Sequence, residues 1–285
     1  MPARGDDLAS YLRLLGYDAP PPPTLDTLTA LHRAHLDALP YDNLDIMLGR
    51  PPETEPAAVL ARIARGGRVG YCFHHNGALG ALLTALGFVV ETRHGHVYTD
   101  PAHREDTSLN HLVLLVRDQP SADNPRGDWW PDVGLGDAFR DPVAVVAGEL
   151  RQHGFDYALT EVGAGAWSFV HDPRGTFTGV EVRDLPLDVA GAHHELSTAE
   201  SSPFTAKLVV QRRQAEGVDT IRGAVLTRLR PTEESRTDLT TYDEWRDALI
   251  DVTRLSLEAV SDDDLRALWT RVELAHSAWD AAGRP

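Results

Sequence analysis

The sequence predicts an α+β protein, because three successive parts of the chain show different patterns. Apolar residues recur at helical spacing in the first part, and short strand-like segments separated by Pro, Gly, Asn and Asp fill the middle. Helical spacing returns near the C-terminus. Helices, then strands, then a mixed segment are typical of an α+β chain with two or three subdomains.

The first part contains four expected helices. Leu8, Tyr11 and Leu15 share one helical face and Gly16 follows as a stop, while Thr24 can cap a second helix that ends before Pro40. The other two helices are expected at residues 56–64 and 77–86, where Gly87 ends the second.

The middle of the chain is expected to form many short strands, which is typical of a barrel or a sandwich. The expected strands are residues 88–91, 95–99, 111–117, 129–134, 155–162, 167–171, 177–182, 206–212, 220–222 and 225–230. Two helices follow, at residues 242–250 and after Ser261, which with Asp264 resembles a capping box.

The composition limits the classes of partner. The net charge of −16 argues against nucleic acid and anionic membrane, since phosphate binding needs clustered Lys and Arg. No apolar run reaches about 18 residues, the length that a membrane-spanning helix needs. Residues 1–7 lack the apolar core of a signal peptide, and the chain has one cysteine, so we expect a cytoplasmic protein.

The single cysteine, Cys72, lies directly before the helix expected at 77–86. A helix N-terminus favours the thiolate over the thiol, and the thiolate is the nucleophile. A lone cysteine is more often a small, buried and inert residue, so the presence of a single cysteine by itself favours the inert interpretation.

A nucleophilic cysteine needs a base, and the base needs an orienting group. His111 begins one expected strand and Asp132 lies in another, so adjacent strands could bring them together. A strand histidine is usually a core or surface residue, and an aspartate near glycines usually makes a turn. The spacing of Cys72, His111 and Asp132 in the sequence does not decide whether they form a catalytic triad, because a triad is recognised by its geometry.

Two other kinds of site are less well supported. His94 and His96, together with His74 and His75, could suggest a metal site, but no second ligand pair occurs at zinc spacing, so we expect none. Gly134-Leu135-Gly136 lacks the third glycine of a dinucleotide fingerprint, and the sequence contains no phosphate-binding loop or Gly-x-Ser-x-Gly motif.

Several ordered segments together resemble the arylamine N-acetyltransferase family. Residues 68–76 (RVGYCFHHN) are similar to the family's R-G-G-Y-C-F-E-H-N, and 40–45 (PYDNLD) to P-F-E-N-L-D. Asn110-His111-Leu112 is similar to T-H-L, residues 132–136 (DVGLG) to D-V-G-F-G, and 202–204 (SPF) to S-P-F. The resemblance covers nearly the whole chain.

The resemblance implies a three-part fold with a Cys-His-Asp core like that of cysteine proteases. Residues 1–87 would form a helical bundle that holds Cys72, residues 88–200 a β-barrel that supplies His111 and Asp132, and residues 201–285 an α/β lid.

The resemblance also implies acyl transfer from acetyl-CoA or another acyl-CoA to an arylamine, hydrazine or related small-molecule amine. The expected ping-pong mechanism uses Cys72 as nucleophile, His111 as base and Asp132 as its orienting group. The acyl-CoA is a co-substrate, and no permanently bound cofactor or metal is implied. Oligomeric state is left open. The implied substrate-pocket residues are Phe73, Val97, Leu135, Gly136 and Phe204.

Four positions depart from the family pattern. His74 replaces a glutamate, Leu135 an aromatic residue, Asn110 a threonine and Val69 a glycine. These departures leave open an amide synthase that acts on a biosynthetic thioester. A thiol hydrolase or transglutaminase-like enzyme would share the Cys, His, Asp order, and a non-catalytic binding module is a third class.

Overall fold

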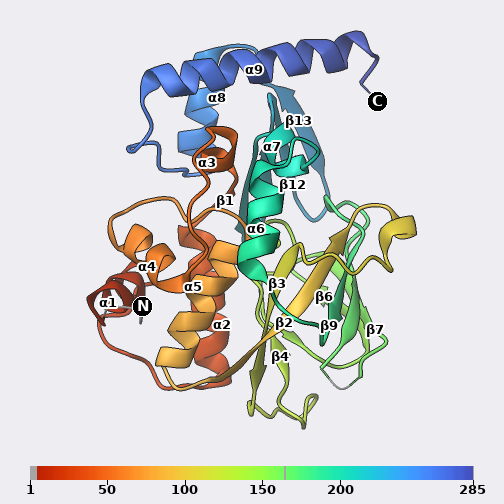
Figure 1. Cartoon of the computed structure of the whole chain (residues 1–285). Coiled ribbons are helices and arrows are strands. Elements are labelled where there is room, and N and C mark those ends of the chain that lie inside the picture. The colour runs from red at the N-terminus through yellow and green to blue at the C-terminus, as the bar shows by residue number, and fades with distance from the viewer. Residues whose placement is uncertain (1–4, 164, 285) are drawn as a thin grey trace.

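The computed structural model describes residues 5–163 and 165–284, and its elements form three groups (Figure 1). A group of N-terminal helices lies beside a large antiparallel sheet, and a smaller sheet with the C-terminal helices lies across one end of both. No helix within the described residues is long and apolar enough to cross a membrane.

The N-terminal helices confirm three of the four expected positions. The elements of this group are α1 (Gly5–Leu14), α2 (Leu25–Ala38), α3 (Leu44–Met47), α4 (Pro56–Ala64) and α5 (Cys72–Ala85). The hydroxyl of Thr24 caps α2 by accepting a hydrogen bond from the backbone N–H of Thr27 at 3.3 Å.

Helix α5 begins five residues earlier than expected, at Cys72 itself. The polar run His74-His75-Asn76 does not look helical, but all three side chains are buried and bonded to partners from other elements. Tertiary contacts therefore override the local preference. Cys72 is the first residue of the helix rather than a residue before it.

The large sheet has eight strands in the order β5-β4-β3-β2-β9-β8-β7-β6. Its strands are β2 (Val89–Tyr98), β3 (His111–Arg117), β4 (Trp129–Trp130), β5 (Val143–Ala144), β6 (Gly148–Gln152), β7 (Phe155–Thr160), β8 (Trp167–Val170) and β9 (Gly179–Arg183), with the 3-10 turn η1 (Pro101–His103) after β2. The two strands expected at 88–91 and 95–99 form the single strand β2. Residues 89–95 of β2 pair with β3 and residues 94–98 pair with β9, so pairing continues along its whole length.

This sheet is strongly curled. Trp130 on β4 and Phe169 on β8 are four strands apart, about 19 Å across a flat sheet at normal strand spacing. Their ring centroids are only 5.1 Å apart, so the sheet bends round a shared apolar core. The barrel expected from the resemblance is thus a curled eight-stranded sheet, in which the described edge strands β5 and β6 do not pair with each other.

The strand expected at 129–134 is much shorter, since β4 ends at Trp130. Pro131 cannot donate a ladder hydrogen bond, which ends the pairing there. Asp132 therefore lies in a loop after the strand rather than in the strand.

The smaller sheet has the order β1-β10-β11-β12-β13. Its strands are β1 (Tyr41–Asp42), β10 (Val209–Gln214), β11 (Gly217–Arg222), β12 (Val225–Leu229) and β13 (Glu234–Asp238). Strand β1 comes from the N-terminal segment, and Tyr41 lies opposite Gln211. The boundaries at 87 and 200 stay a prediction, but the first segment contributes a strand to the third group.

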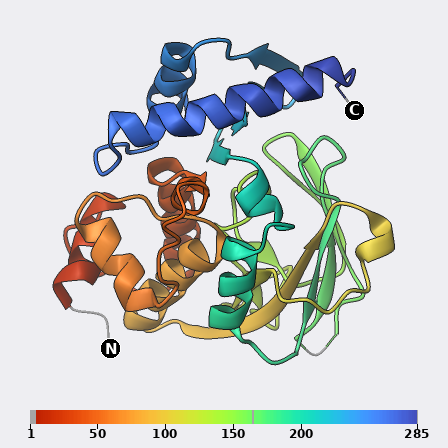
Figure 2. The ribbon, with the colours of Figure 1, turned by 45° about the horizontal axis from the view of Figure 1, so that its top comes forward.

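Further helices come from the last third of the chain. They are α6 (Val189–Thr198), α7 (Pro203–Ala206), α8 (Tyr242–Asp247), the π-helical turn η2 (Ala248–Val252) and α9 (Asp262–Ala281). Figure 2 shows α8 and α9 at one end of the molecule and α6 between the N-terminal helices and the eight-stranded sheet. Helix α6 and strands β6 and β13 are missing from the sequence-based expectation. Ser261 caps α9, as predicted.

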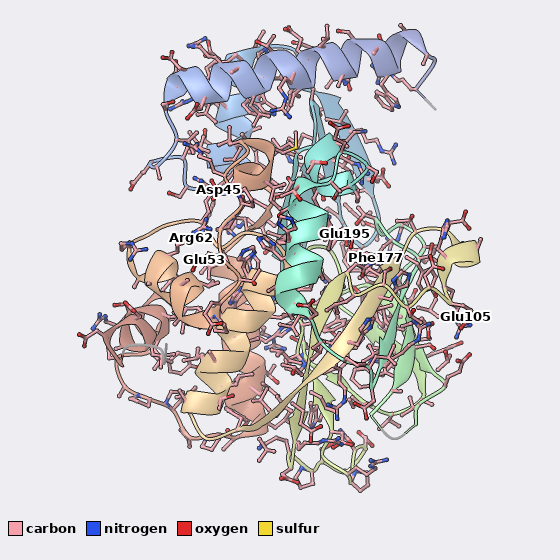
Figure 3. All side chains as sticks on the ribbon, in the orientation of Figure 1. Asp45, Glu53, Arg62, Glu105, Phe177 and Glu195 are labelled. Atoms are coloured by element: carbon pink, nitrogen blue, oxygen red, sulfur yellow. The ribbon has the colours of Figure 1, made fainter. Side chains whose placement is uncertain are left out.

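A buried ion network ties the segment before Cys72 to the rest of the fold. The Arg68 side chain is 5% exposed, pairs with Asp45 and donates to the carbonyl of Ser256 at 2.9 Å. Arg62 on α4 also binds Asp45, at 2.7 Å, and the two are labelled close together in Figure 3. Asp42 lies 3.9 Å from Arg68. Burial raises the pKa of Asp42 to about 6, and the charge of Arg68 opposes this rise.

Replacing Arg68 with methionine should destabilise the protein by about 3–5 kcal/mol, because it leaves buried carboxylates without their cation. The measurement is the free energy of unfolding in urea. Arg50→Met is the matched control, since Arg50 pairs with Asp264 at 3.3 Å with both side chains about half exposed; it should cost less than about 1 kcal/mol. Equal losses in the two variants would contradict the role given to the buried network.

Candidate active site

Cys72 lies at the N-terminus of α5, where it is 3% exposed. Its Sγ is 3.5 Å from the carbonyl oxygen of Asn110, the residue just before β3. The first turn of a helix has backbone N–H groups without helical partners, and these favour negative charge nearby. The position therefore suits an anionic sulfur.

Asp132 is a buried carboxylate with four hydrogen-bond donors. His111 Nε2 donates to Oδ2 at 2.7 Å, and the indole Nε1 of Trp130 donates to the same oxygen at 3.0 Å. Oδ1 accepts from Asn76 Nδ2 and from the backbone N–H of Gly134, both at 2.9 Å. Burial raises the pKa of Asp132, but His111 and the other donors outweigh this and lower it. The carboxylate is therefore held ionised.

His111 connects Asp132 to Cys72. Its Nε2 is bonded to Asp132, which leaves Nδ1 for Cys72, the other side chain that interacts with the ring. Burial by itself lowers the pKa of His111. The charge and hydrogen bond of Asp132, with a contribution from Cys72, outweigh burial and raise it to about 10. The ring is therefore protonated at neutral pH.

Gly134 allows the Asp132 loop to lie directly on α5. A Cβ at this position would be 2.8 Å from Cys72 Cα and 3.1 Å from Asn76 Nδ2. Distances this short are not tolerated, so a glycine is required for the loop and the helix to approach. The same contact brings the backbone N–H of Val133 within 3.0 Å of Asn76 Oδ1.

His32 on α2 supports the loop from the other side. Its Nδ1 lies 2.7 Å from the carbonyl oxygen of Arg140 and must donate to it. Burial lowers the pKa of His32 to about 4, so the ring is neutral and Nε2 carries no proton. Nε2 therefore accepts from the backbone N–H of Asp132, 3.0 Å away.

Other histidines near Cys72 are also neutral. His75 Nδ1 lies 2.6 Å from His35 Nε2, and the second nitrogen of His35 bonds to Tyr11. Burial lowers the pKa of His75 to about 4 and that of His35 well below its usual value. These rings contribute hydrogen bonds to the core rather than charge.

Comparisons with known proteins show which family the chain belongs to. A sequence profile of a family described as N-acetyltransferase matches residues 24–261. The arylamine N-acetyltransferase of Mycolicibacterium smegmatis is 35% identical over 219 residues, which cover 72% of this chain and 75% of that protein. The chain belongs to the arylamine N-acetyltransferase family. It is an acyltransferase of that type.

Solved structures of arylamine N-acetyltransferases share the fold. A structure from M. smegmatis has a TM-score of 0.81 and 28% identity, and covers 93% of this chain and 97% of that one. The Mycobacterium marinum enzyme in complex with CoA has a TM-score of 0.79 at 24% identity, and covers 93% of this chain and 98% of that one.

The five predicted pocket residues of this arylamine N-acetyltransferase family member fall into three places. Phe204 and the fully buried Phe73 belong to the apolar cluster around Cys72, where both rings contact Tyr71. Val97 and Leu135 pack against the core of the eight-stranded sheet. Gly136 lies at the smaller sheet, where its φ is +76° and a Cβ would be 2.1 Å from Gln211 Oε1. Their role in binding stays a prediction.

Two departures from the family pattern have clear structural roles. His74 Nε2 donates to the carbonyl of Pro52 at 3.2 Å, so Nδ1 of the neutral ring accepts from the backbone N–H of Tyr71 at 3.4 Å. It thus acts as the side-chain acceptor that a glutamate supplies in a capping box. Asn110 bonds both backbone groups of Val97, at 2.7 and 2.9 Å, and so joins β2 to the residue before His111.

Asn76 and Tyr41 are site residues that the sequence-based prediction missed. Asn76 lies one helical turn after Cys72, and that spacing on one face could have indicated it. Tyr41 stacks on His75, with ring centroids 6.2 Å apart and planes 17° apart. Tyr41 also packs against the apolar cluster that contains Cys72. Burial raises the pKa of Tyr41, and the charge of Cys72 raises it further.

His96, one of the histidines considered for a metal site, has both ring nitrogens close to backbone groups. Both ring nitrogens of His96 lie within 3.0 Å of backbone carbonyl oxygens, those of Ser108 and His103. Within residues 5–163 and 165–284, no group of three or more His, Cys, Asp or Glu side chains is arranged to hold a metal ion.

Gly134→Ala should destabilise the protein by about 1–3 kcal/mol, because the added methyl group forces the Asp132 loop away from α5. Urea unfolding measures the loss. Gly163→Ala is the control, since a Cβ there has no atom within 4 Å, and it should change stability by less than about 0.5 kcal/mol. A Gly134 variant as stable as the control would show that the loop does not depend on this close approach.

The raised pKa of His111 predicts a pH dependence of stability. A histidine whose pKa rises from 6.5 to about 10 on folding stabilises the fold fully below pH 6.5. That contribution is lost as the pH rises towards 10. Between pH 6.5 and pH 10, the free energy of unfolding of wild type should therefore fall by at least about 1 kcal/mol more than that of Asp132→Asn. The measurement is unfolding at pH 6.5, 8 and 10, and parallel curves for the two proteins would contradict the assignment.

Proposed function

We propose that this protein transfers an acetyl or other acyl group from acyl-CoA to an arylamine, hydrazine or related amine through an acyl-Cys72 intermediate. The observation that carries the proposal is the Cys72–His111–Asp132 arrangement at the start of α5. The CoA complex of the M. marinum enzyme supports coenzyme A as the donor.

The first half-reaction forms the acyl-enzyme. The Cys72 sulfur attacks the thioester carbonyl carbon, and the carbon–sulfur bond to coenzyme A breaks. His111 is protonated in the resting state and gives its proton to the departing thiolate. Backbone N–H groups in the first turn of α5 stabilise the negative oxygen of the tetrahedral intermediate.

The second half-reaction transfers the acyl group to the amine. The amine nitrogen attacks the carbonyl carbon of acyl-Cys72, and neutral His111 accepts the proton that the nitrogen loses. The amide leaves as the carbon–sulfur bond breaks, and the thiolate and the imidazolium are restored. Asp132 holds the His111 ring in one orientation throughout through its 2.7 Å hydrogen bond.

The proposal predicts amine-dependent release of coenzyme A. Wild type should release one equivalent of CoA from acetyl-CoA quickly, and further turnover should require an arylamine such as 4-aminobenzoate. Cys72→Ala should abolish both phases, and Asp132→Asn should lower turnover by about 10²–10⁴-fold. Stopped-flow detection of free CoA thiol, with mass spectrometry of the acetylated protein, gives the measurement.

The same assay separates the alternatives. Steady release that no amine changes would indicate a thiol hydrolase and contradict the transferase. Acylation by a biosynthetic thioester in place of acetyl-CoA, followed by amine capture, would indicate an amide synthase. No acylation of Cys72 by any thioester would leave only the binding-module interpretation.

A further inference from the structure

Cys72 lies under a cover that four segments of the chain supply. The residue is 3% exposed and belongs to a buried apolar cluster. The cover consists of the partly buried residues that pack against this cluster: Tyr41 on β1, Leu109 before β3, Phe204 on α7, and Leu187, Val189, Ala192 and Leu196 in and just before α6. A reacting atom must come within about 3–3.5 Å of the sulfur. Part of the cover therefore has to move before a substrate can react with Cys72.

Three of the four segments are fixed by hydrogen bonds. Asn110, the residue after Leu109, bonds both backbone groups of Val97 at 2.7 and 2.9 Å. Asn43 donates to the backbone carbonyl of Phe204 at 2.8 Å, and strand β1 pairs with β10. These three segments form the fixed part of the cover.

The fourth segment, helix α6, is held more loosely. Figure 1 and Figure 2 both show it on the outside of the molecule, between the N-terminal helices and the eight-stranded sheet. Ser197 is buried, and the other residues of α6 are half-buried or exposed, as are residues 184–188, which lead into the helix from β9. A helix of ten residues is marginal in water by itself, so α6 depends on its contacts with the rest of the fold.

His193 supplies the polar contact of α6 with the segment around Cys72. Its ring contacts the rings of Tyr71 and His74, with centroids 5.6 and 5.3 Å away. Burial lowers the pKa of His193, so the ring is neutral and has one N–H, which the carbonyl of Pro52 accepts. Nδ1 therefore accepts from the hydroxyl of Tyr71, 2.7 Å away. Tyr71 caps α5 directly before Cys72, so this hydrogen bond joins α6 to the site itself.

The C-terminal end of α6 is attached to the segment that follows it. Ser202 Oγ donates to the carbonyl of Leu196 at 2.5 Å, and Thr205 Oγ1 donates to the carbonyl of Ala199 at 2.7 Å. These bonds stay intact if the rest of the helix moves away from His74 and Tyr71. Elements with few buried contacts open locally at a lower free-energy cost than the whole fold.

We propose that α6 is a movable flap over Cys72, which the Tyr71–His193 hydrogen bond holds closed and which opens by swinging about its attachment to α7. The open flap lets a thioester or an amine reach the sulfur, and the closed flap excludes water from the acyl-enzyme. The identity of the substrates that it admits rests on the proposed function, whereas the opening itself does not.

Alkylation of the thiol measures how often the flap is open without any acyl donor. His193→Phe keeps an aromatic ring but leaves the buried Tyr71 hydroxyl without its acceptor. The rate of Cys72 alkylation by iodoacetamide should therefore rise about tenfold, the effect of one lost hydrogen bond on the open fraction. His193→Asn should stay within about twofold of wild type, because its amide oxygen can replace Nδ1 as acceptor. Mass spectrometry of the intact protein gives the rates.

His194→Phe is the matched control. His194 is the next residue of the same helix, and it is exposed. Its variant should be alkylated at the wild-type rate. Equal increases in the His193→Phe and His194→Phe variants would show a general loosening of α6 and overturn the hydrogen bond as the closing contact. An unchanged rate in His193→Phe would overturn it as well.

Hydrogen exchange identifies the part of the fold that opens. The backbone amides of α6 should exchange about tenfold faster in His193→Phe than in wild type, and those of α5 should not change. An equal increase in α5 would show that the whole fold is destabilised, and would reject the flap. Faster exchange in α6 without faster alkylation would also reject it, since α6 would then not cover the thiol.

The flap and the proposed function can fail separately. If alkylation and exchange respond as expected but acetyl-CoA releases no coenzyme A, the proposed function is rejected and the flap is retained. If coenzyme A is released in the amine-dependent way but α6 exchanges as slowly as α5 in wild type, the flap is rejected and the proposed function is retained.

Discussion

The ionised carboxylate of Asp132 organises the centre of this protein, because a buried charge must be surrounded by donors to remain stable. Its four donors come from four places: the helix that carries Cys72, the strand that begins with His111, strand β4 and its own loop. Removing any one donor would leave the buried Asp132 carboxylate with fewer hydrogen bonds in an apolar interior, which is unfavourable for its charge. The Asp132 carboxylate therefore fixes the position of the helices relative to the large sheet, and it also fixes the geometry of the Cys72 thiol and the His111 imidazole.

His111 differs in charge from the other buried histidines around it because it has a carboxylate partner. His32, His35, His74 and His75 are buried without a carboxylate partner, and each has a pKa below the usual range. His111 is equally buried but bonds to Asp132, and its pKa moves in the opposite direction. Burial alone makes a histidine neutral, so the aspartate decides which ring is charged. The neutral rings orient backbone and side-chain groups. Of these five buried histidines, only His111 is positively charged near Cys72.

Local patterns predicted the bounds of several elements. The helices at α2 and α4 and the strand at β3 have the expected bounds or nearly so, since caps and apolar spacing are visible in the sequence. The start of α5 was missed because the partners of His75 and Asn76 lie 40 and 56 residues away, on other elements. The resemblance indicated Cys72, His111 and Asp132 as the candidate triad, and that role stays a prediction. The contacts of Asn76, His32 and Gly134 with the Asp132 loop depend on tertiary approach that no sequence pattern contains.

Strand β1 has a consequence for how the protein is made. Tyr41 and Asp42 pair with residues 210 and 211, which are synthesised some 170 positions later. The segment before Cys72 is therefore incomplete while most of the chain emerges from the ribosome, since its neighbouring strand does not yet exist. Contacts so distant in sequence form late in folding. A nascent or truncated chain that contains the cysteine, the histidine and the aspartate would still lack the strand that supports Tyr41 beside the thiol.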